Sequence, residues 1–327
     1  MAAVGPISET GSILPRPNQL TTVPTAINIP RTDALFRARQ TGSYATPWWL
    51  WWNVLSFDAP TVAVVWSLLF ARTGGVRLGP AEEIALILSV WIIYISDRIF
   101  DGCESVNCPD LQERHRFCLR HRVALVWIVL LATLAAFWVT TKYLPSTEAG
   151  AGIRLAAIVG AYLVCIHVGR EWVVRFLPKE ITVGILYAVG ATLPIWSRAA
   201  EPSRDMSVSI ILFALICSLN CLAIDCWEGH IPHHASYQAW HSSARCNKSR
   251  INWIALGLAA VALTLFLLRH AKGVPGSELW AISLAALLIF LINRHTGRFS
   301  LPALRVLADA VLVAAGVIAL LIRVWGI

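Results

Sequence analysis

Apolar residues in this chain gather into long continuous blocks. Nine blocks of roughly 17 to 23 residues alternate with short polar stretches, and that length crosses a hydrocarbon core of about 30 Å. They run approximately over 48–70, 82–101, 123–141, 153–169, 180–197, 207–227, 251–268, 278–293 and 302–325. Lipid cannot satisfy free backbone groups, and the period-two pattern of barrel strands is absent. We therefore predict an all-α polytopic membrane protein, with nine transmembrane helices around a central cavity.

The stretch before the first block has a different character. Residues 1–43 are rich in Pro, Thr and Ser, and they hold no apolar segment behind a charged start, as a signal peptide would. We predict a flexible cytoplasmic tail over 1–43, followed by one nine-helix transmembrane domain over 44–327.

Composition and charge agree with a membrane protein. The chain is 57% hydrophobic and 14% charged, whereas soluble domains carry about 25% charged residues. We interpret the net charge of +8 as loop charge that sets topology, and we expect contact with membrane lipids and not with nucleic acid. If the N-terminus lies in the cytoplasm, 18 of the 27 Lys and Arg fall on that side. We expect an integral protein of a bacterial inner (cell) membrane, with a cytoplasmic N-terminus.

Two of the blocks end in carboxylates that share one helical face. Asp97 and Asp101 are four residues apart at the end of the second block, and Asp225 and Glu228 are three apart at the end of the sixth. Both blocks are even-numbered, so both ends lie on the same side of the membrane. Unpaired carboxylates are costly there. We predict that the two helix ends face each other across one cation-holding site.

Carboxylates on facing helices suit Mg²⁺, which completes its six oxygens with water and substrate phosphates. A diphosphate bridged by Mg²⁺ is a good leaving group. We predict that Asp97, Asp101, Asp225 and Glu228 are the catalytic and metal-binding residues. Basic residues of the same side would stabilise the departing diphosphate, and an amide would help to position it. The predicted substrate-binding residues are Asn220, Arg98, Arg114, Arg116, Arg175 and Lys179.

This arrangement resembles the UbiA superfamily of intramembrane prenyltransferases. Members of that family have nine transmembrane helices, with one Asp-rich motif at the end of helix two and another at the end of helix six. Residues 179–190, KEITVGILYAVG, are similar to the basic-start, glycine-containing fifth helix of the family. The resemblance covers the chain from about residue 45 onward.

The two motifs match in part. Asp97 and Asp101 fit the last four-residue step of the family's Asn-Asp-x-x-Asp-x-x-x-Asp, and Ile93 and Tyr94 stand where its Asn and first Asp would be. In the second motif, Asp-x-x-x-Asp, Asp225 fits the last position. Its first position is taken by Cys221, and Glu228 is a possible substitute ligand.

The resemblance implies an Mg²⁺-dependent transfer of a polyprenyl group from its diphosphate to a lipophilic acceptor, in particular an aromatic one. The motif departures favour a second hypothesis, in which a UbiA-like protein has lost catalysis and acts as a lipid or isoprenoid binder or as a transporter. Transporters often contain Gly- or Pro-broken helices, and none is obvious in this sequence.

Structural roles compete with the catalytic ones at the predicted site. Asp97 could pair with Arg98 or Arg114, and Asp225 could bind loop amides. Asn220 could contact substrate or bind a neighbouring helix. Both alternatives remain open at each position.

Other polar residues lie inside apolar blocks or in loops. Asp58 either lines the cavity or satisfies backbone groups freed by Pro60, whereas Arg305 and Asp309, four residues apart, predict an ion pair on a helix surface. The histidines of 230–241 are predicted to belong to a cap over the site. Most cysteines fall on the predicted cytoplasmic side, where thiols stay reduced.

Overall fold

The computed structural model describes residues 47–104, 113–168, 178–198, 203–228 and 247–324, with backbone alone at 101–104, 113–116, 168 and 323–324. The chain divides into two units, Met1–Ala45 and Thr46–Ile327, and every described residue lies in the second. The predicted tail, 1–43, lies outside the described residues.

The described residues form helices and no strand, as the apolar blocks predict. The α-helices are α2 (Trp51–Val54), α3 (Asp58–Thr73), α4 (Pro80–Glu104), α5 (Glu113–Arg120), α6 (Arg122–Tyr143), α7 (Ser146–Val168), α9 (Lys179–Ala191), α10 (Leu193–Arg198), α11 (Arg204–Glu228), α13 (Lys248–Ala271), α14 (Ser277–Arg294) and α15 (Leu301–Val324). Two short 3₁₀ helices, η1 (Trp48–Leu50) and η3 (Thr296–Arg298), precede α2 and α15.

Each predicted span coincides with one helix or with a broken pair of helices. Within the described residues, α6, α7, α11, α13, α14 and α15 are long and apolar enough to cross a membrane, and α2 with α3 makes a seventh candidate that bends by 77°. These six or seven candidates are fewer than the nine predicted. Helix α4 contains six charged residues, at 82, 83, 97, 98, 101 and 104, and α9 ends after 13 residues.

Side chains before several helices mark where those helices begin. Pro80 opens α4, and the Gly79 N–H donates to Oε2 of Glu82 at 2.7 Å. Asn247 caps α13 by accepting from the Ser249 N–H at 2.9 Å. These are typical N-terminal signals, because the first N–H groups of a helix have no partner within it.

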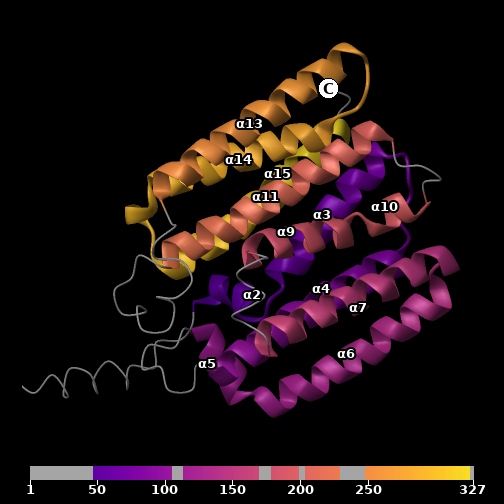
Figure 1. The fold of residues 1–327 in the computed structure, drawn as a ribbon, viewed down its shortest axis with the longest axis vertical. Coiled ribbons are helices and arrows are strands. Elements are labelled where there is room, and N and C mark those ends of the chain that lie inside the picture. The colour runs from indigo at the N-terminus through magenta and orange to yellow at the C-terminus, as the bar shows by residue number, and fades with distance from the viewer. Residues whose placement is uncertain (1–46, 105–112, 169–177, 199–202, 229–246, 325–327) are drawn as a thin grey trace, which may run out of the picture. The chain divides into compact units, whose positions relative to one another are not determined.

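The core lies mainly around α11, which packs against α9, α13, α14 and α15, while α3 packs between α15 and α4 (Figure 1). Trp66 of α3 stacks on Phe213 of α11, with ring centroids 4.5 Å apart. A smaller apolar cluster joins α4, α5 and α6 through Ile95, Cys118 and Leu125. Helix α5 occupies a stretch that we predicted as loop.

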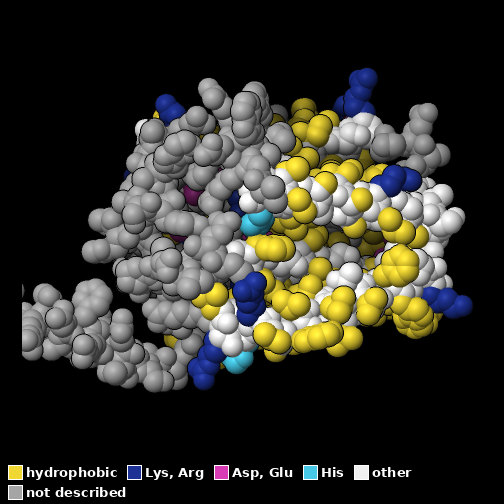
Figure 2. Space-filling view, turned by 60° about the horizontal axis from the view of Figure 1, so that its bottom comes forward, with side chains coloured by type: hydrophobic (Ala, Val, Ile, Leu, Met, Phe, Trp, Pro, Cys, Tyr) yellow, Lys and Arg dark blue, Asp and Glu magenta, His cyan; other side chains and the backbone are white. Residues whose placement is uncertain are grey.

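Helix α6 presents an apolar face to the outside of the bundle. Trp127, Leu131, Phe137 and Trp138 are each more than half exposed. Apolar side chains cover much of the described surface seen in Figure 2, and Lys and Arg are sparse there. A face like this is stable in lipid and unfavourable in water. Together with the long apolar helices, it identifies an integral membrane protein.

The first predicted span is broken between α2 and α3. Ser56 has a positive φ of 58°, a backbone conformation that side chains other than glycine rarely adopt. Helix α4 holds the break, because Nη1 of Arg98 donates to the Val54 carbonyl at 3.1 Å and Nε1 of Trp91 donates to the Leu55 carbonyl at 2.9 Å. No Gly- or Pro-broken helix is obvious in the sequence, yet the single span predicted over 48–70 is broken. Neither Gly nor Pro stands at 55–57 to signal the break.

Candidate functional site

Polar side chains gather at both ends of the helix bundle. At one end, Thr73 of α3, Ser209 of α11 and Arg269 of α13 all contact Glu278 of α14; we call it the Glu278 end. The opposite ends of these helices, with the C-terminus of α4 and the N-terminus of α9, form what we call the Asp225 end. All the residues predicted from the carboxylate motifs belong to the Asp225 end.

Lys179 of α9 pairs with the carboxylate of α4. Its Nζ lies 3.6 Å from Oδ1 of Asp97, and both side chains are partly exposed, at 39% and 28%. Asp225 of α11 lies within electrostatic range of the same lysine and of Glu180. No described residue makes a hydrogen bond or ion pair with the Asp225 carboxylate. The N-terminus of α9 thus pairs with the first motif and acts on the second through electrostatics alone.

Glu228 forms an ion pair with Arg305 of α15. Its Oε1 accepts from Nε of Arg305 at 2.6 Å, and the two residues are only 8% and 4% exposed. The surface pair expected between Arg305 and Asp309 is therefore wrong: Arg305 is buried against Glu228, and Asp309 accepts from Asn220. We call Asp97, Lys179, Asp225, Glu228 and Arg305 the outer layer.

The remaining predicted site residues differ in how much of each the structure describes. Arg98 is buried and donates to the carbonyls of Asn53 and Val54, so its guanidinium serves the broken helix. Asp101 lies in α4, one turn beyond Asp97, and Arg114 and Arg116 lie in α5; of these three residues only the backbone is described. Arg175 and the histidines of 230–241 lie outside the described residues.

A second polar group lies deeper along the same helices. Asn220 precedes Asp225 by five residues, Asp309 follows Arg305 by four, and Tyr94 precedes Asp97 by three. At a rise of about 1.5 Å per residue, they lie roughly 4 to 8 Å farther into the bundle. Together with Asp58 and Tyr187, we call them the inner layer.

A small pocket opens among the residues of the inner layer. Its volume is about 30 Å³, and its polar lining comprises Tyr94, Tyr187, Asn220, Asp309 and the thiols of Cys217 and Cys221. About 10–15 Å³ measured in this way holds one water, so the pocket has room for about two. It is too small for a prenyl chain and is not the central cavity that the sequence predicts.

Hydrogen bonds link the inner layer to the broken helix. Nδ2 of Asn220 donates to Oδ1 of Asp309 at 2.9 Å, and Asp309 lies within hydrogen-bonding reach of Asp58. Asp58 in turn accepts from the Ala59 N–H at 2.9 Å and from Nδ2 of Asn53. Asp58 therefore satisfies the Ala59 N–H at the start of α3, and it is not among the residues that line the pocket.

Asn220 bonds a neighbouring helix, which is one of its two predicted alternatives, and it also lines the pocket; the substrate contact stays a prediction. The sequence marks Asp58 and Asp309 as unusual, since both stand in apolar blocks. It offers no signal that they meet, because they are 251 residues apart.

The described residues contain no group of three or more His, Cys, Asp or Glu side chains close enough to hold a metal ion. Mg²⁺ often needs only one or two protein carboxylates when substrate phosphates complete its shell. Asp97 and Asp225 fit that requirement, because a single lysine at 3.6 Å is the ion-pair partner of Asp97 and none is described for Asp225. Glu228 fits less well, because Arg305 already occupies its Oε1.

Cys226 is disulfide-bonded. The expectation of reduced thiols is therefore wrong for Cys226, whereas Cys118, Cys165, Cys217 and Cys221 are free.

The chain matches no protein-family model, no curated protein and no solved structure.

Proposed function

We propose that this chain is an Mg²⁺-dependent intramembrane prenyltransferase of the UbiA type. It would move a polyprenyl group from its diphosphate to a lipophilic acceptor, in particular an aromatic one. One observation carries the proposal: Lys179 of α9 pairs with Asp97 of α4 at 3.6 Å, and Asp225 of α11 lies within electrostatic range of the same lysine. Carboxylates from two helices around an ammonium group are suited to a diphosphate and its metal ion.

The roles follow from the partners of each residue. Asp97 and Asp225 would hold the metal ion that a diphosphate brings, and Mg²⁺, when bound, neutralises charge on the leaving group. The electron pair of the breaking carbon–oxygen bond leaves with the diphosphate, and Lys179 stabilises that charge. The acceptor then forms its new bond to the allylic cation. Asp101, Arg114, Arg116 and Arg175 would add ligands and positive charge around the diphosphate.

Glu228 and Arg98 act through other residues in this proposal. Glu228 holds Arg305 near the outer layer through the 2.6 Å bond, and Arg98 holds the break between α2 and α3. We expect both to position the site without being its principal ligands.

We further propose that α4 and the α9–α10 pair also cross the membrane, which makes nine crossings with α2–α3. Helix α4 has 25 residues, about 37 Å of helix, and it packs between α3 and α6. The distribution of Lys and Arg supports a cytoplasmic Asp225 end, whereas the disulfide at Cys226 argues for the opposite side. Reporter fusions at the C-terminus test the orientation: a reporter active only outside the cytoplasm supports a cytoplasmic N-terminus.

The deciding experiment is diphosphate release by the purified protein. Labelled farnesyl or geranylgeranyl diphosphate is supplied with and without Mg²⁺, to the wild type and to Asp97→Asn and Asp225→Asn. We expect release that needs Mg²⁺ and falls at least tenfold in each variant. Glu83→Gln is the matched control, because Glu83 lies on α4 near its other end. Metal-independent release, or equal release by all four proteins, would sink the proposal.

The second candidate function is an isoprenoid binder or transporter. The break between α2 and α3 favours it, because broken helices are typical of transporter sites. In the same experiment this function predicts saturable retention of the prenyl diphosphate without any release of diphosphate.

A further inference from the structure

The pocket of the inner layer contains an unused hydrogen-bond acceptor. Asn220 is 5% exposed, and its Oδ1 has no hydrogen-bond partner. Its Nδ2 is already directed at Asp309, which fixes the orientation of the amide, because a carboxylate can only accept. An unsatisfied buried acceptor is destabilising, because it has lost its hydrogen bonds to water. The pocket therefore suits a ligand that is a cation or a hydrogen-bond donor.

The charged side chains around the pocket restrict the class of ligand that it can bind. The inner layer brings together the carboxyl groups of Asp58 and Asp309, and Arg98 of α4 is the cation that acts on Asp309. When both carboxyl groups are ionised, they exceed this one guanidinium by a single negative charge, and unbalanced charge is expensive in a membrane interior. One monovalent cation balances this charge, whereas a divalent ion would leave a positive excess of the same size.

Size and chemistry agree with a small inorganic ion. About 30 Å³ accommodates an ion of sodium or potassium size with one water. The lining offers oxygen ligands of the kind that alkali cations prefer: Oδ1 of Asn220, the Asp309 carboxyl and the Tyr94 hydroxyl. Tyr187 completes the wall and is itself fixed, because its hydroxyl donates to the Ala59 carbonyl at 2.6 Å.

We propose that the inner layer binds one monovalent metal cation, Na⁺ or K⁺, through Asn220 and Asp309, with Asp58 as the balancing charge. The ion would connect α11 and α15 and would reach α3 through Asp58. This site is separate from the proposed diphosphate site, and it stands whether or not the chain transfers prenyl groups.

Equilibrium binding of radiolabelled Na⁺ and of a K⁺ tracer to the purified full chain in detergent tests the proposal. We expect saturable binding of one of the two ions, near one per chain, with at least tenfold weaker binding in Asp309→Asn and in Asn220→Ala. Glu83→Gln should bind like the wild type, since its carboxylate lies near the far end of α4.

Thermal unfolding supplies a second readout. At constant ionic strength, the favoured alkali ion should raise the midpoint of the wild type above its value in choline chloride, and Asp309→Asn should lose that difference. No saturable binding of either ion to the wild type would overturn the proposal, as would undiminished binding by a folded Asp309→Asn protein. In that case a proton shared by Asp58 and Asp309 balances the charge. The wild-type measurement is decisive even if a variant fails to fold.

Discussion

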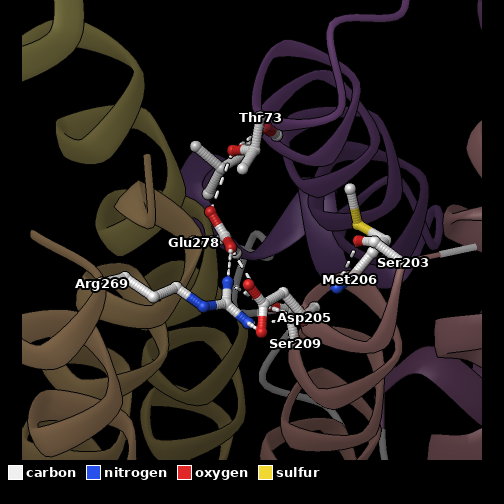
Figure 3. Close-up of polar contacts among 8 residues, drawn as sticks. Thr73, Ser203, Asp205, Met206, Ser209, Arg269 and Glu278 are labelled. Carbon is white, nitrogen blue, oxygen red and sulfur yellow. Dashed lines mark hydrogen bonds and ion pairs between the residues drawn. The ribbon is translucent and has the colours of Figure 1, made fainter. Parts of the chain in front are cut away.

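The Glu278 end and the Asp225 end use charged residues in opposite ways. Glu278 is fully buried, and both its carboxylate oxygens accept hydrogen bonds, Oε2 from Thr73 at 2.9 Å and Oε1 from Ser209 and Arg269 at 3.0 Å (Figure 3). In the outer layer of the Asp225 end, Asp97 and Lys179 are partly exposed and 3.6 Å apart. Asp225 has no hydrogen bond from a described residue.

A second group, which is partly exposed, also holds its carboxylates in ion pairs. Arg198 at the end of α10 contacts Glu82 of α4 and lies 3.0 Å from Glu148 of α7, which is 1% exposed. Satisfied buried pairs hold helix ends in fixed positions, and carboxylates without such partners remain able to bind ligands. This difference indicates that charged residues hold helices in place at the Glu278 end and are available for ligands at the Asp225 end.

The largest expected effect is at the Glu278 end. Glu278→Ala leaves the Arg269 guanidinium buried without its carboxylate, which we expect to lower the free energy of unfolding by about 3–5 kcal/mol. Denaturant titration of the purified wild type and variant measures this difference in the free energy of unfolding. The double variant Arg269→Met with Glu278→Met should be more stable than Glu278→Ala. If Glu278→Ala unfolds like the wild type, the two ends do not differ as we describe.

The next effect concerns the wall of the inner pocket. A Cβ at Gly184 would lie 2.6 Å from the backbone N of Ser218, so Gly184→Ala forces α9 away from α11. We expect a loss of about 1–3 kcal/mol, read from the thermal midpoint. Gly257→Ala in α13 is the control, because its Cβ would meet nothing within 4 Å. Equal midpoints for the two variants would show that α9 and α11 are not closely packed in solution.

A smaller effect is expected at the broken helix. Ser56→Gly relieves a positive φ at a buried position, worth about 1–3 kcal/mol, less about 0.5–1 kcal/mol for the added freedom of glycine. The variant should therefore be more stable by about 1 kcal/mol. Ser56→Ala keeps the strain and removes the same unpartnered hydroxyl, so Ser56→Gly should be the more stable of the two variants. A destabilised Ser56→Gly would mean that the break in solution does not need this conformation.

The smallest effects on stability belong to the outer layer. Asp97→Asn removes a partly exposed ion pair, and such pairs contribute about 0–1 kcal/mol. Asp225→Asn removes a carboxylate that no described residue binds. We expect both variants to unfold within about 1 kcal/mol of the wild type, even though both should lose Mg²⁺-dependent diphosphate release. A large loss of stability in either one would show that its carboxylate is structural, as at the Glu278 end.

The sequence by itself determined the secondary structure and the lipid environment. Apolar blocks of spanning length coincide with helices because a helix satisfies its own backbone groups, and that requirement depends only on local sequence. Caps such as Asn247 and openings such as Pro80 are local for the same reason. The sequence also identified Asp97, Asp225 and Asn220 as unusual polar positions in or beside apolar segments.

Only the tertiary structure decided the partner of each charge. Glu228 pairs with Arg305 and Asp309 meets Asn220 and Asp58 because α15 packs against both α3 and α11, and helical spacing carries no information about contacts across 77 to 251 residues. The break at Ser56 is likewise a tertiary feature, since Arg98 and Trp91 of another helix hold it. Long-range packing therefore divides the carboxylates of this chain into those that stabilise the bundle and those that remain available for ligands.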